Sequence, residues 1–113
     1  MATAKEQGTA MFKAKNFQAA IQLYTQAIAE NPSDHTIYGN RSAAYHNTKN
    51  FVDALADGEK CISIKSDWAK GHQRKAMALH GMRKYEEAAA AYQDGLNLDP
   101  ANAQLKSGYD QVT

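Results

Sequence analysis

The sequence has little of what stabilises secreted or membrane-spanning proteins. Of its 113 residues, one is cysteine and two are proline, so no internal disulfide can form and few helix breakers interrupt the chain. No apolar run approaches the length of about 18 residues that a membrane-spanning helix needs. The first ten residues also lack the apolar segment of a signal peptide. We therefore expect a cytoplasmic protein.

The chain also lacks an excess of charge of either sign. Thirteen Lys and Arg residues face twelve Asp and Glu residues, a net charge of +1, which offers nothing in bulk to nucleic acid or to an anionic membrane. Hydrophobic residues make up 43% and charged residues 22%, as in ordinary folded domains, so a disordered chain is excluded. A charge-driven function would have to come from local clusters.

Signatures of catalysis and of metal binding are missing as well. There is no glycine-rich phosphate loop, no GxSxG motif and no HExxH motif. None of the histidines lies four residues from another, so no helix face pairs two of them as metal ligands. The four histidines are His35, His46, His72 and His80. We expect no catalytic residue, no metal and no cofactor.

What the sequence does have is helical spacing of its apolar residues and self-similarity at an offset of 34 residues. An aromatic column contains Phe17, Phe51 and Tyr85, an alanine column Ala20, Ala54 and Ala88, and a small-residue column Ala27, Cys61 and Gly95. Apolar, small and turn columns agree in one register, which chance does not explain. Because Cys61 occupies a crowded helix-packing position, we expect an inert buried thiol there.

A period of 34 residues with this pattern resembles the tetratricopeptide repeat, in which each unit is a pair of antiparallel helices. The resemblance covers essentially the whole chain and implies an all-α right-handed superhelix. Its three repeats would span about 1–34, 35–68 and 69–102, followed by a capping helix at about 101–112. We expect seven helices, at about 2–14, 17–30, 35–48, 51–64, 68–81, 85–98 and 101–112. Residues 1–113 would form a single domain, the N-terminal one of a longer protein.

Local signals predict where some helices begin and what the outer face looks like. Asp34 can cap the third helix, Ser66-Asp67 can cap the fifth, and Asp99 can cap the seventh with Pro100 in its first turn. Acidic residues gather on the second helix of each unit, which forms the convex outside of such a stack. We expect a solvated acidic face made of Asp53, Asp57, Glu59, Glu86, Glu87 and Asp94.

Basic residues on the first helices indicate a binding site. Lys70 and Arg74 are four residues apart and therefore share one helix face. Asn40 holds the position of Arg74 one repeat earlier, and Lys5 lies one place before that column. On a concave face these side chains would converge on a carboxylate, because Arg and Lys donate charge-assisted hydrogen bonds and an amide adds a neutral donor. The alternative is scattered surface charge.

Three segments resemble tetratricopeptide repeats of the carboxylate-clamp type. They are KEQGTAMFKAKNF from Lys5, YGNRSAAY from Tyr38 and DWAKGHQRKAMAL from Asp67. The resemblance implies a groove that grips the free C-terminus of a heat-shock chaperone ending in Glu-Glu-Val-Asp. The carboxylate ligands it implies are Lys5, Asn40, Lys70 and Arg74. The family pattern expects asparagine four residues after the first lysine, where this chain has Thr9, so a hydroxyl would have to replace an amide.

The run from Asn40 to Leu98 is similar to the first repeat domain of the Hop-type organising co-chaperones, which link heat-shock proteins 70 and 90. This similarity implies a monomeric adaptor for the heat-shock protein 70 tail, with heat-shock protein 90 as second candidate and no nucleic acid or membrane partner. It also implies that Phe12, Ala43, His46 and His80 flank the clamp. Two alternatives stay open: a scaffold that binds another peptide or itself, which Thr9 favours, and the targeting domain of a larger enzyme.

Overall fold

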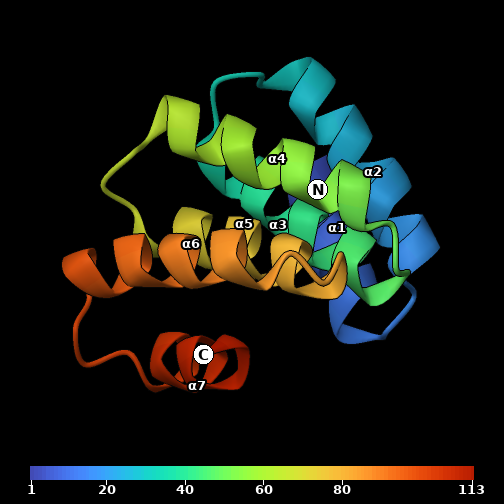
Figure 1. Cartoon of the computed structure of the whole chain (residues 1–113). Helices are drawn as coiled ribbons and strands as arrows, with labels where there is room; N and C mark the ends of the chain where they lie inside the picture. Colours follow the sequence, from blue (N-terminus) through green and yellow to red (C-terminus); the bar gives the residue numbers. More distant parts are fainter.

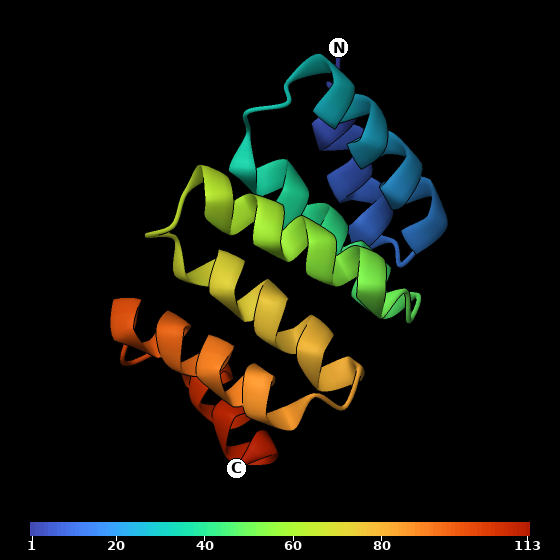
Figure 2. The same cartoon turned by 45° about the horizontal axis from the view of Figure 1, so that its top comes forward.

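The computed structural model describes all 113 residues and contains seven helices and no strand. In chain order the helices are α1 (Ala4–Lys13), α2 (Phe17–Glu30), α3 (His35–Asn47), α4 (Phe51–Ile64), α5 (Ala69–Gly81), α6 (Tyr85–Leu98) and α7 (Ala103–Val112). Figures 1 and 2 show the helices stacked in this order from the N-terminus to the C-terminus. The predicted all-α architecture is confirmed, and the helix bounds differ from the expected ones by no more than two residues.

The helices form an inner and an outer layer. Neighbours in sequence pack in pairs, α1 with α2, α3 with α4 and α5 with α6, and α7 covers α6. The odd-numbered helices also touch one another, because α3 contacts both α1 and α5, and α7 contacts α5, whereas the even-numbered helices make no mutual contact. The odd helices therefore line the inside of a curved stack that measures 43 × 25 × 21 Å. None of the seven helices has the length and hydropathy of a membrane span.

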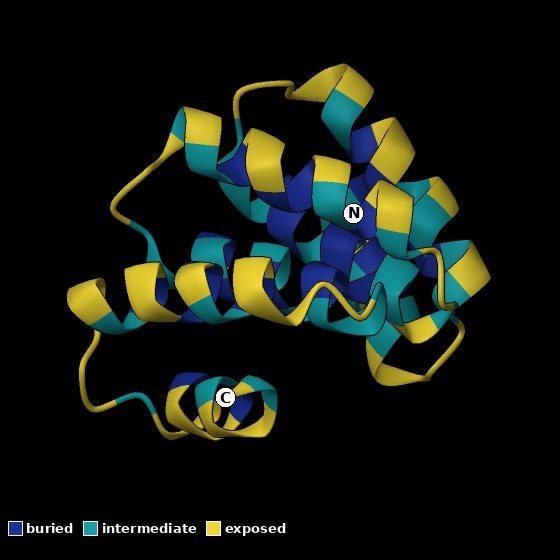
Figure 3. Cartoon of the chain, viewed as in Figure 1, coloured by how far each residue is buried: buried dark blue, intermediate teal, exposed yellow.

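Small residues set the distance between helices. The alanine column is completely buried at Ala20, Ala54 and Ala88. A Cβ atom on Gly8 would lie 2.8 Å from the ring of Tyr24, and one on Gly58 would lie 2.9 Å from the backbone nitrogen of Lys75. A larger residue at Gly58 would push α4 away from α5. Figure 3 shows the result, with buried residues between the helices and exposed residues on the outward sides of α4 and α6.

Cys61 and Trp68 close the seam between the second and third repeats. Cys61 has no exposed surface, and burial raises the pKa of its thiol to about 11. A Cβ atom on Gly39 would lie 3.0 Å from the Trp68 ring, and one on Gly71 would lie 3.1 Å from the Cys61 sulfur. The prediction of a buried thiol is confirmed, and its high pKa keeps it in the unreactive protonated form.

The turn inside each repeat is the same, and no glycine makes it. Lys15, Lys49 and Arg83 have φ values of 63°, 64° and 62°. At the first turn the Lys15 amide donates to the Phe12 carbonyl at 2.9 Å and the Asn16 amide to the Met11 carbonyl at 2.8 Å, which is the Schellman pattern of a helix end. The same pair of bonds recurs at the other two turns. A cation at the carboxyl end of a helix is favoured by the helix dipole, and this offsets part of the strain.

Of the three predicted helix caps, only that of Asp34 is confirmed. Its carboxylate accepts a hydrogen bond from the Thr36 amide at 3.0 Å. Trp68 occupies the cap position of α5 without a side-chain bond, because Asp67 pairs with Lys65 at 2.9 Å instead. At α7 the cap is Asn102, which accepts from the Leu105 amide at 3.0 Å.

The other wrong cap, Asp99, accepts a hydrogen bond from the Asn102 side chain at 3.1 Å. Pro100 therefore lies in the loop before α7 and not in its first turn.

The prediction of a wholly solvated acidic face is wrong at Asp57, which is only 4% exposed. Arg41 on α3 grips its carboxylate through two hydrogen bonds of 2.7 Å, a bidentate geometry that arginine favours. The same guanidinium donates to Thr25 on α2 at 3.1 Å. One side chain thus ties α2, α3 and α4 together across the boundary between the first two repeats.

Candidate functional site

The inner layer carries a groove of about 810 Å³ that reaches from α1 and α3 across α5 to α7. Only four of its fourteen lining residues are hydrophobic, so it suits a ligand with many polar groups. Five of the nine predicted site residues line it, namely Phe12, His46, Lys70, Arg74 and His80. The other four, Lys5, Thr9, Asn40 and Ala43, do not.

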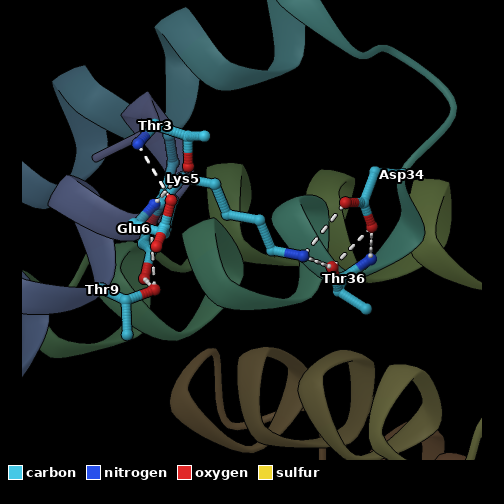
Figure 4. Close-up of polar contacts among 7 residues, drawn as sticks. Thr3, Lys5, Glu6, Thr9, Asp34 and Thr36 are labelled. Carbon is cyan, nitrogen blue, oxygen red and sulfur yellow. Dashed lines mark hydrogen bonds and ion pairs between the residues drawn. The ribbon is translucent and has the colours of Figure 1, made fainter. Parts of the chain in front are cut away.

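Lys5 is held by partners within the chain. Its ammonium group donates to the Asp34 carboxylate at 3.0 Å and to the Thr36 hydroxyl at 2.6 Å, and Figure 4 shows the side chain extended from α1 toward both. It lines a separate hollow of about 500 Å³ beside Asp34. Partial burial opposes the charge on Asp34, but hydrogen bonds from Thr36 and Lys5 hold the pKa of its carboxyl below the usual value.

The hydroxyl of Thr9 is also engaged. It lies 3.1 Å from the Lys5 carbonyl and 3.0 Å from the Tyr24 hydroxyl. A threonine hydroxyl has one proton, and the Lys5 carbonyl can only accept, so that proton goes to the carbonyl and Tyr24 donates to Thr9. The hydroxyl therefore keeps no donor for a ligand carboxylate. Asn40, by contrast, is half-buried on α3 and takes part in no side-chain hydrogen bond.

Arg74 on α5 is the opposite case. Its Nε atom is buried and has no hydrogen-bond partner, and its one other contact is a weak one of 3.8 Å to the Met77 sulfur. No carboxylate of the chain pairs with it. Burial lowers the pKa of Arg74, although guanidinium groups remain charged in proteins. A buried donor without an acceptor is costly, so the groove presents a cation that lacks its anion.

Lys70 completes the exposed charge of this end of the groove. It lies one turn before Arg74 on α5, is exposed, and forms no salt bridge. Its ammonium group sits 5.9 Å from the centre of the Trp68 ring, a cation–π distance. Together the two side chains can meet one carboxylate group from two directions.

The flanking residues are aromatic or small. The ring of His46 packs edge-on against Phe51 at 5.4 Å. Burial, and then the positive charges of Arg74 and His80, lower the pKa of His46. His80 lies 3.1 Å from the Tyr92 hydroxyl through its Nδ1 atom. Ala43 is 6% exposed and lies in the helix packing.

Sequence reasoning missed a polar wall on the other side of the groove. It comes from α5 and α7 and consists of Gln73, Gln104, Ser107 and Gln111. Gln104, Ser107 and Gln111 are spaced by three and four residues, which places them on one face of α7. The spacing of these residues is visible in the sequence, whereas the capping role of the helix is predicted from its apolar residues alone.

The structure offers no cluster of three or more metal-ligating side chains.

Two curated proteins show how far the similarity extends. The chain is 45% identical over 108 residues to the heat shock protein sti1 homolog of Schizosaccharomyces pombe, which covers 96% of this chain and 18% of that protein. It is 47% identical over 105 residues to the Hsp70-Hsp90 organizing protein of Triticum aestivum, covering 93% of this chain and 18% of that protein. The chain thus spans about a fifth of the length of these relatives.

Two solved structures have the same arrangement of helices. The second TPR domain of human RPAP3, in complex with the HSP70 peptide SGPTIEEVD, matches with a TM-score of 0.93 and 25% identity, over 97% of this chain and 92% of that one. The first TPR domain of Spaghetti (RPAP3), bound to the HSP90 peptide SRMEEVD, matches with a TM-score of 0.93 and 28% identity, over 96% and 86%.

Family models agree with the helix pairs and with the period of 34 residues. One model described as tetratricopeptide repeat matches residues 5–66, and a second with the same description matches residues 69–102. The first spans α1 to α4 and the second spans α5 and α6, so the matches cover all three pairs. The chain belongs to the tetratricopeptide repeat family.

Proposed function

We propose that this chain is a co-chaperone adaptor module whose groove binds the C-terminal Glu-Glu-Val-Asp tail of heat-shock protein 70 or 90. The observation that carries the proposal is the buried, unpartnered Nε atom of Arg74 beside the unpaired Lys70 in a polar groove. A free C-terminal aspartate brings two carboxylates, which supply the missing anion. Related domains bound to tails ending in EEVD support this choice.

The site residues contribute unequally to peptide binding. Lys70 and Arg74 hold the terminal carboxylates, and Asn40 adds its amide from α3. Phe12, His46 and His80 contact residues upstream. Lys5 joins only by leaving Asp34, and Thr9 orders α1 through Tyr24. The module acts in the cytoplasm and performs no catalytic step of its own.

The test is a titration with the peptide EEVD as the free acid and as the C-terminal amide. We expect binding of the free acid only, and its loss in Lys70→Ala. The matched control is Lys60→Ala, which removes an exposed cation from α4 outside the groove. Equal binding of acid and amide, or no binding, would refute the proposal.

The paired Lys5 and the occupied hydroxyl of Thr9 favour a second candidate, a scaffold for a different peptide. Two of the five predicted carboxylate-binding residues, Lys5 and Thr9, would then stabilise the fold rather than bind a peptide. Equal affinity for the free acid and the amide in the same titration would favour this candidate.

A further inference from the structure

The polar wall formed by α7 is continuous with the groove that holds Lys70 and Arg74. Gln104, Ser107 and Gln111 line this groove together with Gln73 of α5. Gln73 is only 7% exposed and donates from its Nε2 atom to the Gln104 Oε1 atom at 3.0 Å. This bond joins α7 to α5 and holds the Gln73 and Gln104 side chains together without a ligand.

The wall retains unused hydrogen-bonding groups. Within the Gln73–Gln104 pair, the amide nitrogen of Gln104 still has its two protons and the Gln73 oxygen can still accept. On the next turn the Gln111 amide nitrogen donates to the Ser107 hydroxyl oxygen at 3.2 Å, which leaves the Gln111 oxygen and the Ser107 proton available. Unused donors and acceptors therefore lie together on a wall that carries no charge.

An extended peptide presents hydrogen-bonding groups of both kinds. Its main chain offers one N–H and one C=O group per residue. The seven helical steps from Gln104 to Gln111 rise by about 10.5 Å, which is the length of about three residues of extended chain. A neutral wall provides no charge partner for acidic side chains, whereas its amide and hydroxyl groups can donate to and accept from the main chain of a peptide.

We propose that the groove side of α7 is a binding subsite for the main chain of about three peptide residues upstream of the acidic C-terminus. The proposal rests on the proposed function, which places that C-terminus at Lys70 and Arg74. The occupant is the extended segment of the same tail, because both sites lie in one continuous groove. The charged end anchors the peptide, and the neutral wall fixes its direction.

The test compares a short and a long peptide. We would measure the affinity of EEVD and of SGPTIEEVD for the wild-type chain and for Ser107→Ala/Gln111→Ala, two exposed positions outside the core. The long peptide should bind more tightly than the short one to the wild type. The double variant should lose about three- to tenfold for the long peptide, as expected for one or two hydrogen bonds, and nothing for EEVD.

Controls separate this subsite from folding and from the clamp. Gln93→Ala removes an exposed glutamine from α6 outside the groove and should leave both affinities unchanged. The advantage of the long peptide should also persist at high salt, because the wall is uncharged. Circular dichroism checks that the double variant retains its helices, and Gln111→Ala alone provides a milder replacement.

The outcomes are distinct. An equal loss for both peptides, or no loss for either, would overturn the subsite while leaving the clamp in place. No binding of either peptide by the wild type would refute the proposed function and the subsite with it.

Discussion

The two ends of the inner layer treat their cations in opposite ways. At the N-terminal end, Lys5 is paired with Asp34 and hydrogen-bonded to Thr36. At the other end, Arg74 is half-buried and its buried Nε atom has no partner, and Lys70 is unpaired. A similar position on the helices thus gives a satisfied cation at one end and an unsatisfied one at the other, and only the latter has a deficit that a ligand can relieve.

The position of a cation on the concave face therefore does not by itself make it a ligand. A peptide carboxylate that approaches Lys5 must compete with a carboxylate that is already there. One that approaches Arg74 displaces no carboxylate of the chain. The binding energy should therefore be concentrated at α5.

The largest expected effect comes from removing the guanidinium of Arg74. Arg74→Met should weaken EEVD binding about ten- to hundredfold, because charge-assisted hydrogen bonds contribute roughly 1.5–3 kcal/mol each. Lys5→Ala should weaken it by less than about fivefold, as for exposed ion pairs. Isothermal titration calorimetry measures both affinities. Equal losses would mean that Lys5 and Arg74 contribute equally to peptide binding.

Arg74→Met also has an expected effect on stability. Replacing an unpaired, half-buried charge by an apolar side chain of similar length is expected to be neutral or stabilising. The melting temperature should therefore stay the same or rise while binding is lost. A clear drop in melting temperature would mean that Arg74 supports the fold.

The next variant frees the cation at the N-terminal end of the inner layer, so that both ends carry unpaired cations. Asp34→Asn removes the carboxylate that holds Lys5 but retains a good helix cap, so EEVD affinity should rise about two- to fivefold. In this background Lys5→Ala should cost more than it does in the wild type, and the difference measures the coupling. Asp67→Asn, which breaks the exposed pair with Lys65 outside the groove, is the control. An unchanged affinity in Asp34→Asn would show that the pair does not restrain Lys5.

The smallest effect is a pH dependence at His46. Burial, Arg74 and His80 lower the pKa of His46 from 6.5, so the free protein holds it neutral at pH 7. Bound carboxylates raise that pKa, so binding takes up a proton and affinity should increase by a few fold as the solution is acidified.

Fluorescence anisotropy at pH 7.5 and 5.8 would measure the gain, and His46→Gln should abolish it. The pKa of Asp34 is held below its usual value of 3.8, so this carboxyl loses its charge, and with it the Lys5 pair, only at a pH below that window. An affinity that falls on acidification would contradict the assignment.

Most of the fold followed from one regularity. The columns at Phe17, Ala20 and Ala27 repeat with the period of the helix pairs, and the helix bounds agree to within two residues. This worked because packing between helices depends on residue size, which the sequence states directly. The same reasoning correctly placed Cys61 in a buried seam.

Polar partners were harder to predict, because they are brought together by tertiary structure. Asp57 was expected in solvent, yet Arg41, sixteen residues earlier, buries it. Asp34 was recognised as a helix cap but not as the partner of Lys5, 29 residues away. The turn residue Lys15 carries the positive φ usually reserved for glycine, and only its recurrence at Lys49 and Arg83 could have signalled a common turn.

The single thiol gives the molecule a natural reporter of its own opening. Cys61 lies on α4 and is inaccessible because it packs next to Gly39 of α3 and Gly71 of α5. A thiol reagent can reach it only when α4 moves away from α3 or α5. The labelling rate would therefore measure how often that seam opens, without introducing a probe. Arg74, the residue proposed to bind the peptide, lies on α5 in the third repeat. The labelling rate measured with bound peptide would therefore report how much the ligand reduces the opening of this seam.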